Sequence, residues 1–246
     1  MGDFAIITGG ANGIGRAVCL RLAAAGISIG IVDRDEPGAQ RAKAEVIAKG
    51  GKAEVYLVDA TDAKQVKEVI RETSYRHGRV DILINVAGGS FYVKRLEELT
   101  WNEWKEELNV NLKSTFLFCR EVAPVMMNQR RGRIINTASN YGVTGCALRT
   151  GYSAAKAAII GFSKSLALEL APYGILVNVI APGPTDTPQV LRKSTPEARQ
   201  RWAREIPLGR TAQPEDIAES VYFLVAQESA YMTGETLHVN GGLVMR

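Results

Sequence analysis

Cysteine and histidine are scarce in this chain of 246 residues, which contains three cysteines and two histidines. Cys19, Cys119 and Cys146 are odd in number and never form a Cys-x-x-Cys pair, so a disulfide framework is not expected. This pattern is typical of the reduced thiols of a cytoplasmic protein. His77 and His238 belong to no His-Glu-x-x-His motif or acidic cluster. We therefore expect no metal site.

Long apolar runs and a large charge of one sign are also missing. No apolar run approaches the ~18 residues of a membrane span, and a strand-like run begins at residue 4, too early for a signal peptide to precede it. The 30 Lys+Arg exceed the 26 Asp+Glu by only four, and the excess is spread along the chain. We expect a cytoplasmic protein that binds neither membranes nor nucleic acid.

Short β-branched runs alternate with long helical patterns along the whole chain. The expected strands are residues 4–7, 27–32, 53–58, 81–84, 133–136, 176–180 and 236–239. The expected helices are residues 13–25, 37–49, 62–77, 101–129, 152–170 and 214–226. Most strands are continuously apolar, as in a parallel sheet buried on both faces. The pattern predicts one α/β domain over 1–246, a Rossmann-like doubly wound parallel sheet of about seven strands with helices on both faces.

One segment breaks this alternation, at residues 181–210 after the sixth expected strand. It opens Ala-Pro-Gly-Pro-Thr-Asp-Thr-Pro and continues with charged, short-helix sequence. In open α/β sheets, ligands bind beyond the carboxyl ends of the strands. We interpret the insertion at about 184–210 as a substrate lid. An exposed loop without a gating role is the alternative.

A glycine-rich turn follows the first expected strand. Residues 8–15 read Thr-Gly-Gly-Ala-Asn-Gly-Ile-Gly. Glycines let such a turn approach a pyrophosphate, which the N–H groups at the start of the next helix then bind. The spacing of Gly10 and Gly15 also fits a P-loop, but Arg16-Ala17 stands where Lys-Ser/Thr is required. The turn therefore predicts a dinucleotide site and excludes a P-loop ATPase.

An acidic residue ends the second expected strand, eighteen residues after Gly15. Asp33 is placed to accept hydrogen bonds from the adenosine ribose hydroxyls and to repel a 2′-phosphate. It favours NAD over NADP. Arg16 and Arg34 argue the other way, since either side chain could reach a phosphate.

Tyr152 and Lys156 lie four residues apart in an expected helix, so they share one face of it. A neighbouring cation favours the phenolate, so we expect Lys156 to lower the pKa of Tyr152 towards the neutral range. The pair is suited to acid–base catalysis.

Over essentially its whole length, the chain resembles the short-chain dehydrogenase/reductase family. The motifs that carry the resemblance are the turn at 8–15, Asp59, Asn85-Val86-Ala87-Gly88, Asn111, Ser139, Tyr152 with Lys156, and Pro182-Gly183. Val86 departs from the pattern, which has a small residue or Asn there. The resemblance implies a homotetramer, with a dimer as the second choice.

The resemblance also implies roles for four residues. Tyr152 would exchange a proton with the substrate oxygen, and Ser139 would hydrogen-bond that oxygen and stabilise its developing charge. Lys156 would hold the nicotinamide ribose. Asn111 would anchor a water that links Lys156 to solvent.

A larger set is implied for cofactor binding. Asp59 would face the adenine, residues 85–88 the adenosine ribose, and Thr185 and Thr187 the nicotinamide carboxamide. The full set is Gly9, Asn12, Gly13, Ile14, Gly15, Asp33, Asp59, Ala60, Asn85, Ala87, Gly88, Tyr152, Lys156, Pro182, Gly183, Thr185 and Thr187.

These roles predict an NAD(H)-dependent oxidoreductase that interconverts a secondary alcohol and a ketone. The candidate substrates are a medium-sized hydroxy acid, a cyclic alcohol or a hydroxyacyl compound, and the candidate substrate residues are Ser139, Asn140, Arg149 and Tyr152. Arg149 could meet a carboxylate or a coenzyme A phosphate, or it could be a solvated loop arginine.

Two alternatives remain. The segment at 233–242 is similar to the 3-oxoacyl-[acyl-carrier-protein] reductases, which use NADPH and dock an acidic carrier through basic residues. Arg130, Arg131 and Arg133 could supply such a patch, whereas Asp33 and Tyr173 weigh against this reading. A non-catalytic dinucleotide sensor on the same fold is the remote alternative.

Overall fold

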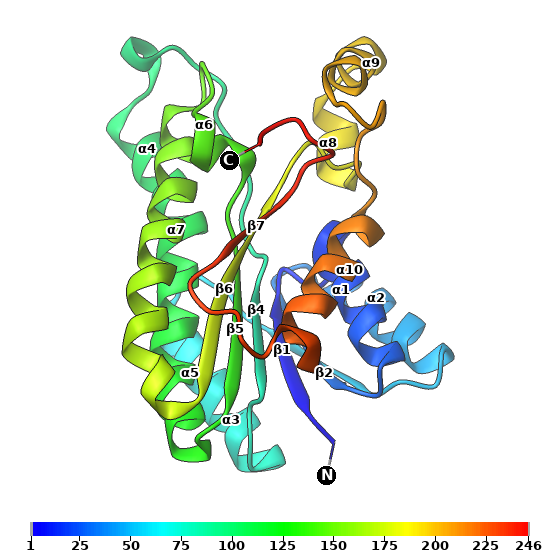
Figure 1. The fold of residues 1–246 in the computed structure, drawn as a ribbon, viewed down its shortest axis with the longest axis vertical. Helices are drawn as coiled ribbons and strands as arrows, with labels where there is room; N and C mark the ends of the chain where they lie inside the picture. The colour runs from blue at the N-terminus through cyan, green and yellow to red at the C-terminus, as the bar shows by residue number, and fades with distance from the viewer. Residues whose placement is uncertain (1, 246) are drawn as a thin grey trace.

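In the computed structural model, which describes residues 2–245, this part of the chain forms one parallel sheet of seven strands in the order β3-β2-β1-β4-β5-β6-β7 (Figure 1). The strands are β1 Phe4–Thr8, β2 Ser28–Asp33, β3 Ala53–Leu57, β4 Ile82–Asn85, β5 Gly132–Thr137, β6 Ile175–Pro182 and β7 Thr236–Val239. The predicted Rossmann-like fold is confirmed, and the expected strands end within two residues of the observed ones. The strand order reverses between β1 and β4, which opens a crevice at the carboxyl ends of the strands.

Helices cover both faces of the sheet (Figure 1). On one face lie α1 Gly13–Ala24, α2 Glu36–Ala48 and α10 Pro214–Val225, and on the other lie α3 Ala63–His77, α5 Ser114–Gln129 and α7 Thr150–Leu170. Successive strand residues point to opposite faces. Ile7 accordingly packs in the core under α1, and its neighbour Ile6 in the core under α5. This two-sided burial explains why the strands read as continuously apolar.

The shorter elements complete the chain. They are the helices α4 Trp101–Leu108, α6 Asn140–Thr144, α8 Pro188–Lys193 and α9 Pro196–Glu205, and the short turns η1 Leu96–Glu98, η2 Asn109–Lys113, η3 Ala171–Tyr173 and η4 Gln227–Ser229.

The single helix expected over 101–129 is wrong, because a π-helical turn, η2, separates α4 from α5. The side chain of Asn111 explains the interruption. Its Nδ2 donates to the carbonyl oxygen of Glu107 at 2.9 Å, the acceptor that a regular helix reserves for the N–H of residue 111. Since the amide occupies that acceptor, the backbone widens locally without leaving the carbonyl unpaired.

A buried chain of polar side chains ties α7 to the centre of the sheet. Asn85 Nδ2 on β4 donates to Asn136 Oδ1 on β5 at 2.8 Å, and Asn136 Nδ2 donates to Ser163 Oγ on α7 at 2.9 Å. All three residues are buried. A buried polar group that lost its partner would be costly, so this chain fixes where α7 lies along β5.

The insertion after β6 folds as the two short helices α8 and α9. Figure 1 shows them at the same end of the molecule as α4 and α6. Thr187 and Thr195 cap them by accepting from the N–H groups of Val190 and Ala198 at 3.2 Å each, and a proline follows each cap.

The glycine-rich turn is closely packed where it meets α1. A Cβ on Gly15 would lie closer than 3.0 Å to the carbonyl oxygen of Gly9, and Gly9 itself has a φ of +67°. Only glycine fits both positions without a shift of the backbone.

We predict that Gly15→Ala lowers the free energy of unfolding by about 1–3 kcal/mol, because the new methyl group meets backbone rather than a flexible side chain. The matched control is Gly161→Ala on α7, where a Cβ would meet nothing within 4 Å. That change should raise the free energy of unfolding by about 0.5–1 kcal/mol. Urea denaturation of both variants measures the difference, and equal stabilities would contradict the packing described.

Candidate active site

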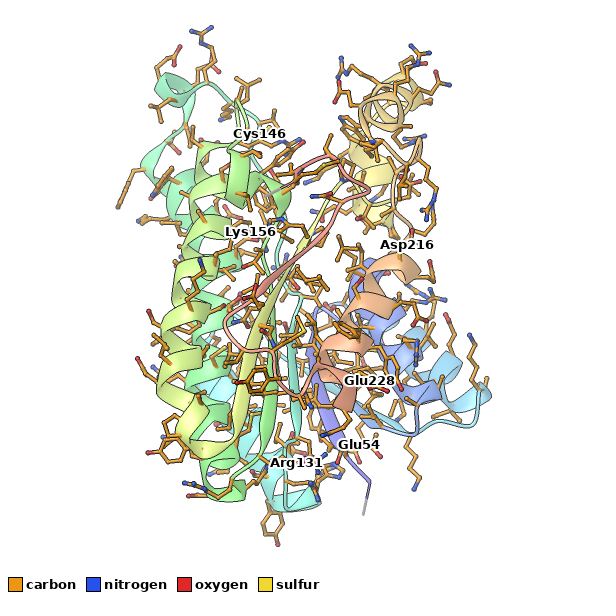
Figure 2. All side chains as sticks on the ribbon, in the orientation of Figure 1. Glu54, Arg131, Cys146, Lys156, Asp216 and Glu228 are labelled. Carbon is orange, nitrogen blue, oxygen red and sulfur yellow. The ribbon has the colours of Figure 1, made fainter. Side chains whose placement is uncertain are left out.

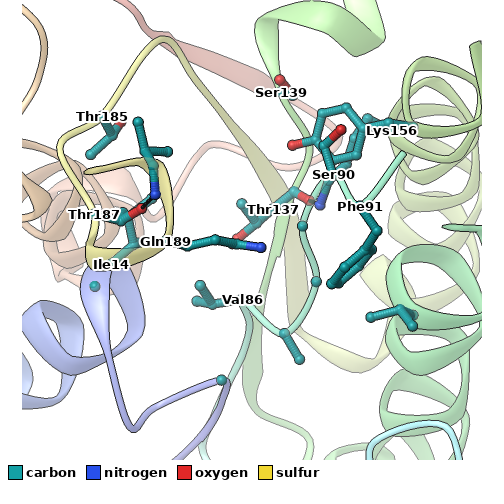
Figure 3. A pocket seen from close by; sticks show the side chains of 18 of the residues that line it. Ile14, Val86, Ser90, Phe91, Thr137, Ser139, Lys156, Thr185, Thr187 and Gln189 are labelled. Carbon is teal, nitrogen blue, oxygen red and sulfur yellow. Dashed lines mark hydrogen bonds between the residues drawn. The ribbon is translucent and has the colours of Figure 1, made fainter. Parts of the chain in front are cut away.

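A cavity of about 1250 Å³ opens at the carboxyl ends of the strands. Its wall is formed by the glycine-rich turn, by the residues that follow β2 to β6, and by α8 and α9. Figure 3 shows Thr185 and Thr187 across the cavity from Ser90 and Ser139. Of the residues predicted from the sequence, those that line it are Gly9, Asn12, Gly13, Ile14, Asp33, Asp59, Ala60, Ala87, Gly88, Ser139, Asn140, Arg149, Tyr152, Lys156, Pro182, Gly183, Thr185 and Thr187.

Three predicted residues lie directly behind this wall. Gly15 packs under the glycine-rich turn, Asn85 is buried against β5, and Asn111 lies behind the loop that follows β4. These three residues therefore support the wall instead of lining the cavity.

Acidic groups characterise the end of the cavity at β2. Asp33 Oδ2 accepts from the N–H of Ala11 at 3.0 Å, which links the end of β2 to the glycine-rich turn. Arg16 forms an ion pair with Glu45 and is not among the residues that line the cavity. Arg34 lines the cavity and has no ion pair within residues 2–245.

At the other end of the cavity, Tyr152 and Lys156 project from α7 towards Ser139. Lys156 is only 3% exposed, and its Nζ donates to the carbonyl oxygen of Thr137 at 2.8 Å. The same Nζ lies 5.6 Å from the centroid of the Tyr152 ring. Burial lowers the pKa of Lys156 to about 8, so the ammonium form still prevails at neutral pH.

The pKa of Tyr152 departs from the expected direction. Burial raises it to about 12, and the groups that oppose the rise are the Ser139 hydroxyl, through a hydrogen bond, and the charge of Arg149. Lys156 is not among the groups that lower it in this structure. The phenol therefore stays protonated at neutral pH.

Gly88, Asn111 and Lys156 meet at one point behind the cavity wall. A Cβ on Gly88, which has a φ of +145°, would lie 2.5 Å from Asn111 Oδ1 and 3.6 Å from Lys156 Nζ. Asn111 also bonds both backbone groups of Gly89, with Oδ1 accepting from its N–H at 3.0 Å and Nδ2 donating to its carbonyl oxygen at 2.9 Å. The π-helical turn thus locks the loop after β4 next to the lysine.

Glu107 is a site residue that the sequence analysis missed. It is 1% exposed, and its Oε1 accepts from the N–H groups of Phe91 and Tyr92 at 2.8 and 3.0 Å. Its charge raises the pKa of both Tyr152 and Lys156. The available signal was an acidic residue four positions before Asn111, on the same face of the helix.

The basic residues at 130–133 lie far from the cavity. They precede or begin β5, whereas the cavity lies where β5 ends. Figure 2 shows Arg131 and Lys156 well separated along the length of the molecule. Arg131 pairs with Asp3, and Arg133 donates to Leu224 and Ser229. They form no patch at the mouth of the cavity.

Two other kinds of feature are absent from residues 2–245. No group of three or more His, Cys, Asp or Glu side chains could hold a metal ion there. None of the helices in that range has the length and apolarity needed to cross a membrane.

Comparisons with known proteins agree on one family. A family model described as enoyl-(acyl carrier protein) reductase matches residues 9–244. The 3-oxoacyl-[acyl-carrier-protein] reductases of Thermotoga maritima and Escherichia coli are 38% and 39% identical to this chain, each over 99% of it and 98% of the relative. Among solved structures, gox2181 has a TM-score of 0.95 at 32% identity, covering 98% of this chain and 95% of its own. A levodione reductase has a TM-score of 0.94 at 31% identity, covering 98% and 96%.

We predict that Glu107→Gln lowers the pKa of Tyr152, because glutamine keeps an oxygen for Phe91 and Tyr92 but removes the negative charge. The pKa is measured by the tyrosinate absorbance that disappears when Tyr152→Phe is added to each background. The control is Glu228→Gln, which removes an exposed carboxylate. An unchanged titration of Tyr152 in the Glu107 variant would show that this charge does not act on the phenol.

Proposed function

This chain belongs to the short-chain dehydrogenase/reductase family, and from that premise we propose that it interconverts a ketone and a secondary alcohol using NAD(H). The observation that carries the proposal is the single cavity into which the glycine-rich turn, Ser139, Tyr152 and Lys156 all face. A sensor that only binds dinucleotides has no need of this acid–base group.

The residues present fit a nicotinamide dinucleotide. Gly9 and Gly13 have positive φ and place no side chain between the turn and the cavity. The start of α1 has no side-chain cap, so its first N–H groups are available to phosphates. When bound, the dinucleotide supplies the hydride. We propose that the dinucleotide is held by the cofactor-binding residues predicted from the sequence. Gly15 and Asn85 belong to this set although they support the wall of the cavity and do not line it.

Side chains of the protein would carry out the proton transfer. In the reductive direction the Tyr152 hydroxyl donates its proton to the carbonyl oxygen, while the Ser139 hydroxyl stabilises the charge that develops on that oxygen. The raised pKa of Tyr152 keeps the phenol protonated at neutral pH, which is the form that reduction requires. Lys156 orients the nicotinamide ribose. Asn111 anchors a water that links Lys156 to solvent, so that the proton given up by Tyr152 can be replaced.

We propose NAD(H) rather than NADP(H) as the preferred cofactor. The carboxylate of Asp33 lines the end of the cavity where a 2′-phosphate would lie, and Arg16 is paired with Glu45. Only Arg34 remains to offset the repulsion. The resemblance to the 3-oxoacyl reductases implies NADPH, so this is the point on which the chain's own residues depart from those relatives.

The names of the relatives favour one substrate class. They support a 3-oxoacyl thioester better than the free hydroxy acid or cyclic alcohol expected from the sequence. The similarity to a levodione reductase supports a small ketone as the second candidate substrate. Both classes present a ketone to Tyr152.

We further propose one cytoplasmic domain that assembles as a homotetramer, with α8 and α9 acting as a lid. Phe116 on α5 and Leu168 on α7 are apolar but 40% and 80% exposed, as expected of helices that meet a second subunit. Cys19 and Cys119 are buried free thiols, consistent with a reducing compartment.

Tyr152→Phe tests the reaction. The phenyl ring keeps the packing but carries no proton, so turnover should fall by about 10²–10⁴-fold while NADH binding stays within about twofold. Rates of NADH consumption with a ketone panel and fluorescence titration of NADH measure the two effects. Unchanged turnover would remove Tyr152 from the mechanism.

The cofactor preference is tested by fluorescence titration of NADH and NADPH at one ionic strength. NADH should bind at least about tenfold more tightly, a difference of about 1.4 kcal/mol. Asp33→Asn, which keeps an oxygen for Ala11, should reduce that ratio. Tighter binding of NADPH by the unaltered protein would overturn the assignment of NAD(H) as the preferred cofactor. It would favour the alternative function, an NADPH-dependent 3-oxoacyl reductase.

A further inference from the structure

Two cationic side chains from separate segments meet at Ser90, in the half of the cavity that holds Tyr152. Arg149 Nη1 donates to Ser90 Oγ at 2.5 Å, and Lys193 Nζ, at the end of α8, donates to the Ser90 carbonyl oxygen at 3.1 Å. Arg149, Lys193 and Ser90 all line the cavity. Figure 3 shows Ser90 on the same side of the cavity as Ser139.

Neither cation is matched by a carboxylate. Within residues 2–245, no Asp or Glu oxygen lies within 4.0 Å of Arg149 or Lys193. The acidic residues lining the cavity are Asp33 and Asp59 at the opposite end, and Glu106, which accepts from the hydroxyl of Tyr92. A serine hydroxyl and a carbonyl oxygen are weak partners for two full charges, so an anion would gain by replacing them.

The two charges also lie near the reacting position. Arg149 comes three residues before Tyr152, and its charge acts on the Tyr152 phenol. Lys193 lies 5.2 Å from the centroid of the Phe91 ring, which fixes it above the loop that Glu107 holds. An anion bound here would therefore lie in the same cavity as a ketone that contacts Tyr152.

We propose that Arg149 and Lys193 form a binding site for an anionic headgroup on the substrate, such as a carboxylate, a sulfonate or a phosphate. The inference rests on the proposed function and narrows its substrate class to small anionic ketones and hydroxy compounds. A neutral acyl chain would leave both cations with only the uncharged oxygens of Ser90 as partners. The guanidinium offers two parallel donors to one planar or tetrahedral anion, and the ammonium adds a point charge from α8.

The site is separate from the one for the cofactor phosphates, which the glycine-rich turn provides at the other end of the cavity. Because Arg149 is carried by the segment before α7 and Lys193 by α8, one anion would bridge the wall and the proposed lid. Binding of the headgroup would then draw α8 towards the reacting ketone.

Binding to the protein saturated with NAD⁺ tests the proposal, because a ketone receives no hydride from the oxidised cofactor. The probes are acetoacetate, 2-oxopropanesulfonate and hydroxyacetone phosphate, with methyl acetoacetate as the neutral counterpart. Calorimetric titration should show at least one anion binding about tenfold or more tightly than the ester. Which anion binds best distinguishes the three headgroups.

Two variants and a control complete the experiment. Arg149→Gln and Lys193→Gln should each reduce the ratio of anion to ester affinity at least about fivefold. Lys193→Arg should retain most of it. Arg201→Gln removes a charge from α9 that does not line the cavity, and should leave the ratio unchanged.

Equal affinity for the ester and all three anions in the unaltered protein would overturn the proposal. So would an undiminished preference in both glutamine variants, which would show that these side chains only hold Ser90. Since no turnover is measured, either failure is distinct from a failure of the proposed reaction, which the Tyr152→Phe variant reports.

Discussion

The burial of one ammonium group organises this site. Lys156 is almost inaccessible to water, and a buried charge is costly unless polar groups surround it. Its hydrogen bond to the carbonyl oxygen of Thr137 fixes α7 to the end of β5. The loop after β4 is fixed beside Lys156 by the Asn111 amide, which bonds both backbone groups of Gly89. The carboxylate of Glu107 supplies a negative charge nearby that favours the ammonium form.

These constraints place Tyr152 without a direct bond from Lys156. The phenol comes one helical turn before the lysine, so fixing α7 also fixes the direction in which Tyr152 points. Ser139 reaches it from the end of β5 as the cap of α6, where its hydroxyl accepts from the N–H of Tyr141 at 3.2 Å. A single buried charge thereby sets the mutual positions of groups from three elements.

The two ends of the cavity differ in charge. Asp33 and Asp59 line the end at β2 and β3 together with one cation, Arg34, whereas Arg149, Lys193 and Lys156 lie at the other end. The uncharged adenosine ribose of the cofactor matches the first end, and an anionic group on the substrate matches the second. In the proposed function, these charges would favour the adenosine ribose at one end and the anionic headgroup of the substrate at the other.

The sequence predicted those parts of this account that depend on local pattern. Short β-branched runs, most of them continuously apolar, identified all seven strands. The glycine-rich turn and Tyr152 with Lys156 could be placed because strand ends meet at one edge of a parallel sheet. The π-helical turn at Asn111 was missed, because a side chain that takes a backbone acceptor leaves no periodic signal. Glu107 was missed although its spacing to Asn111 was visible, because its role depends on the loop that it holds. The meeting of Lys193 and Arg149 at Ser90 depends on contacts between distant segments, which no spacing reveals.

The pKa of Lys156 tests the central claim most directly. Titration of the ¹³Cε resonances of labelled lysine, with Lys156→Met to assign the signal, should place this pKa at about 8 in the free protein. That value would show an ammonium that is buried yet still charged at neutral pH. A value near the ordinary lysine pKa of ~10.4 would mean that the group is solvated, and would contradict the account.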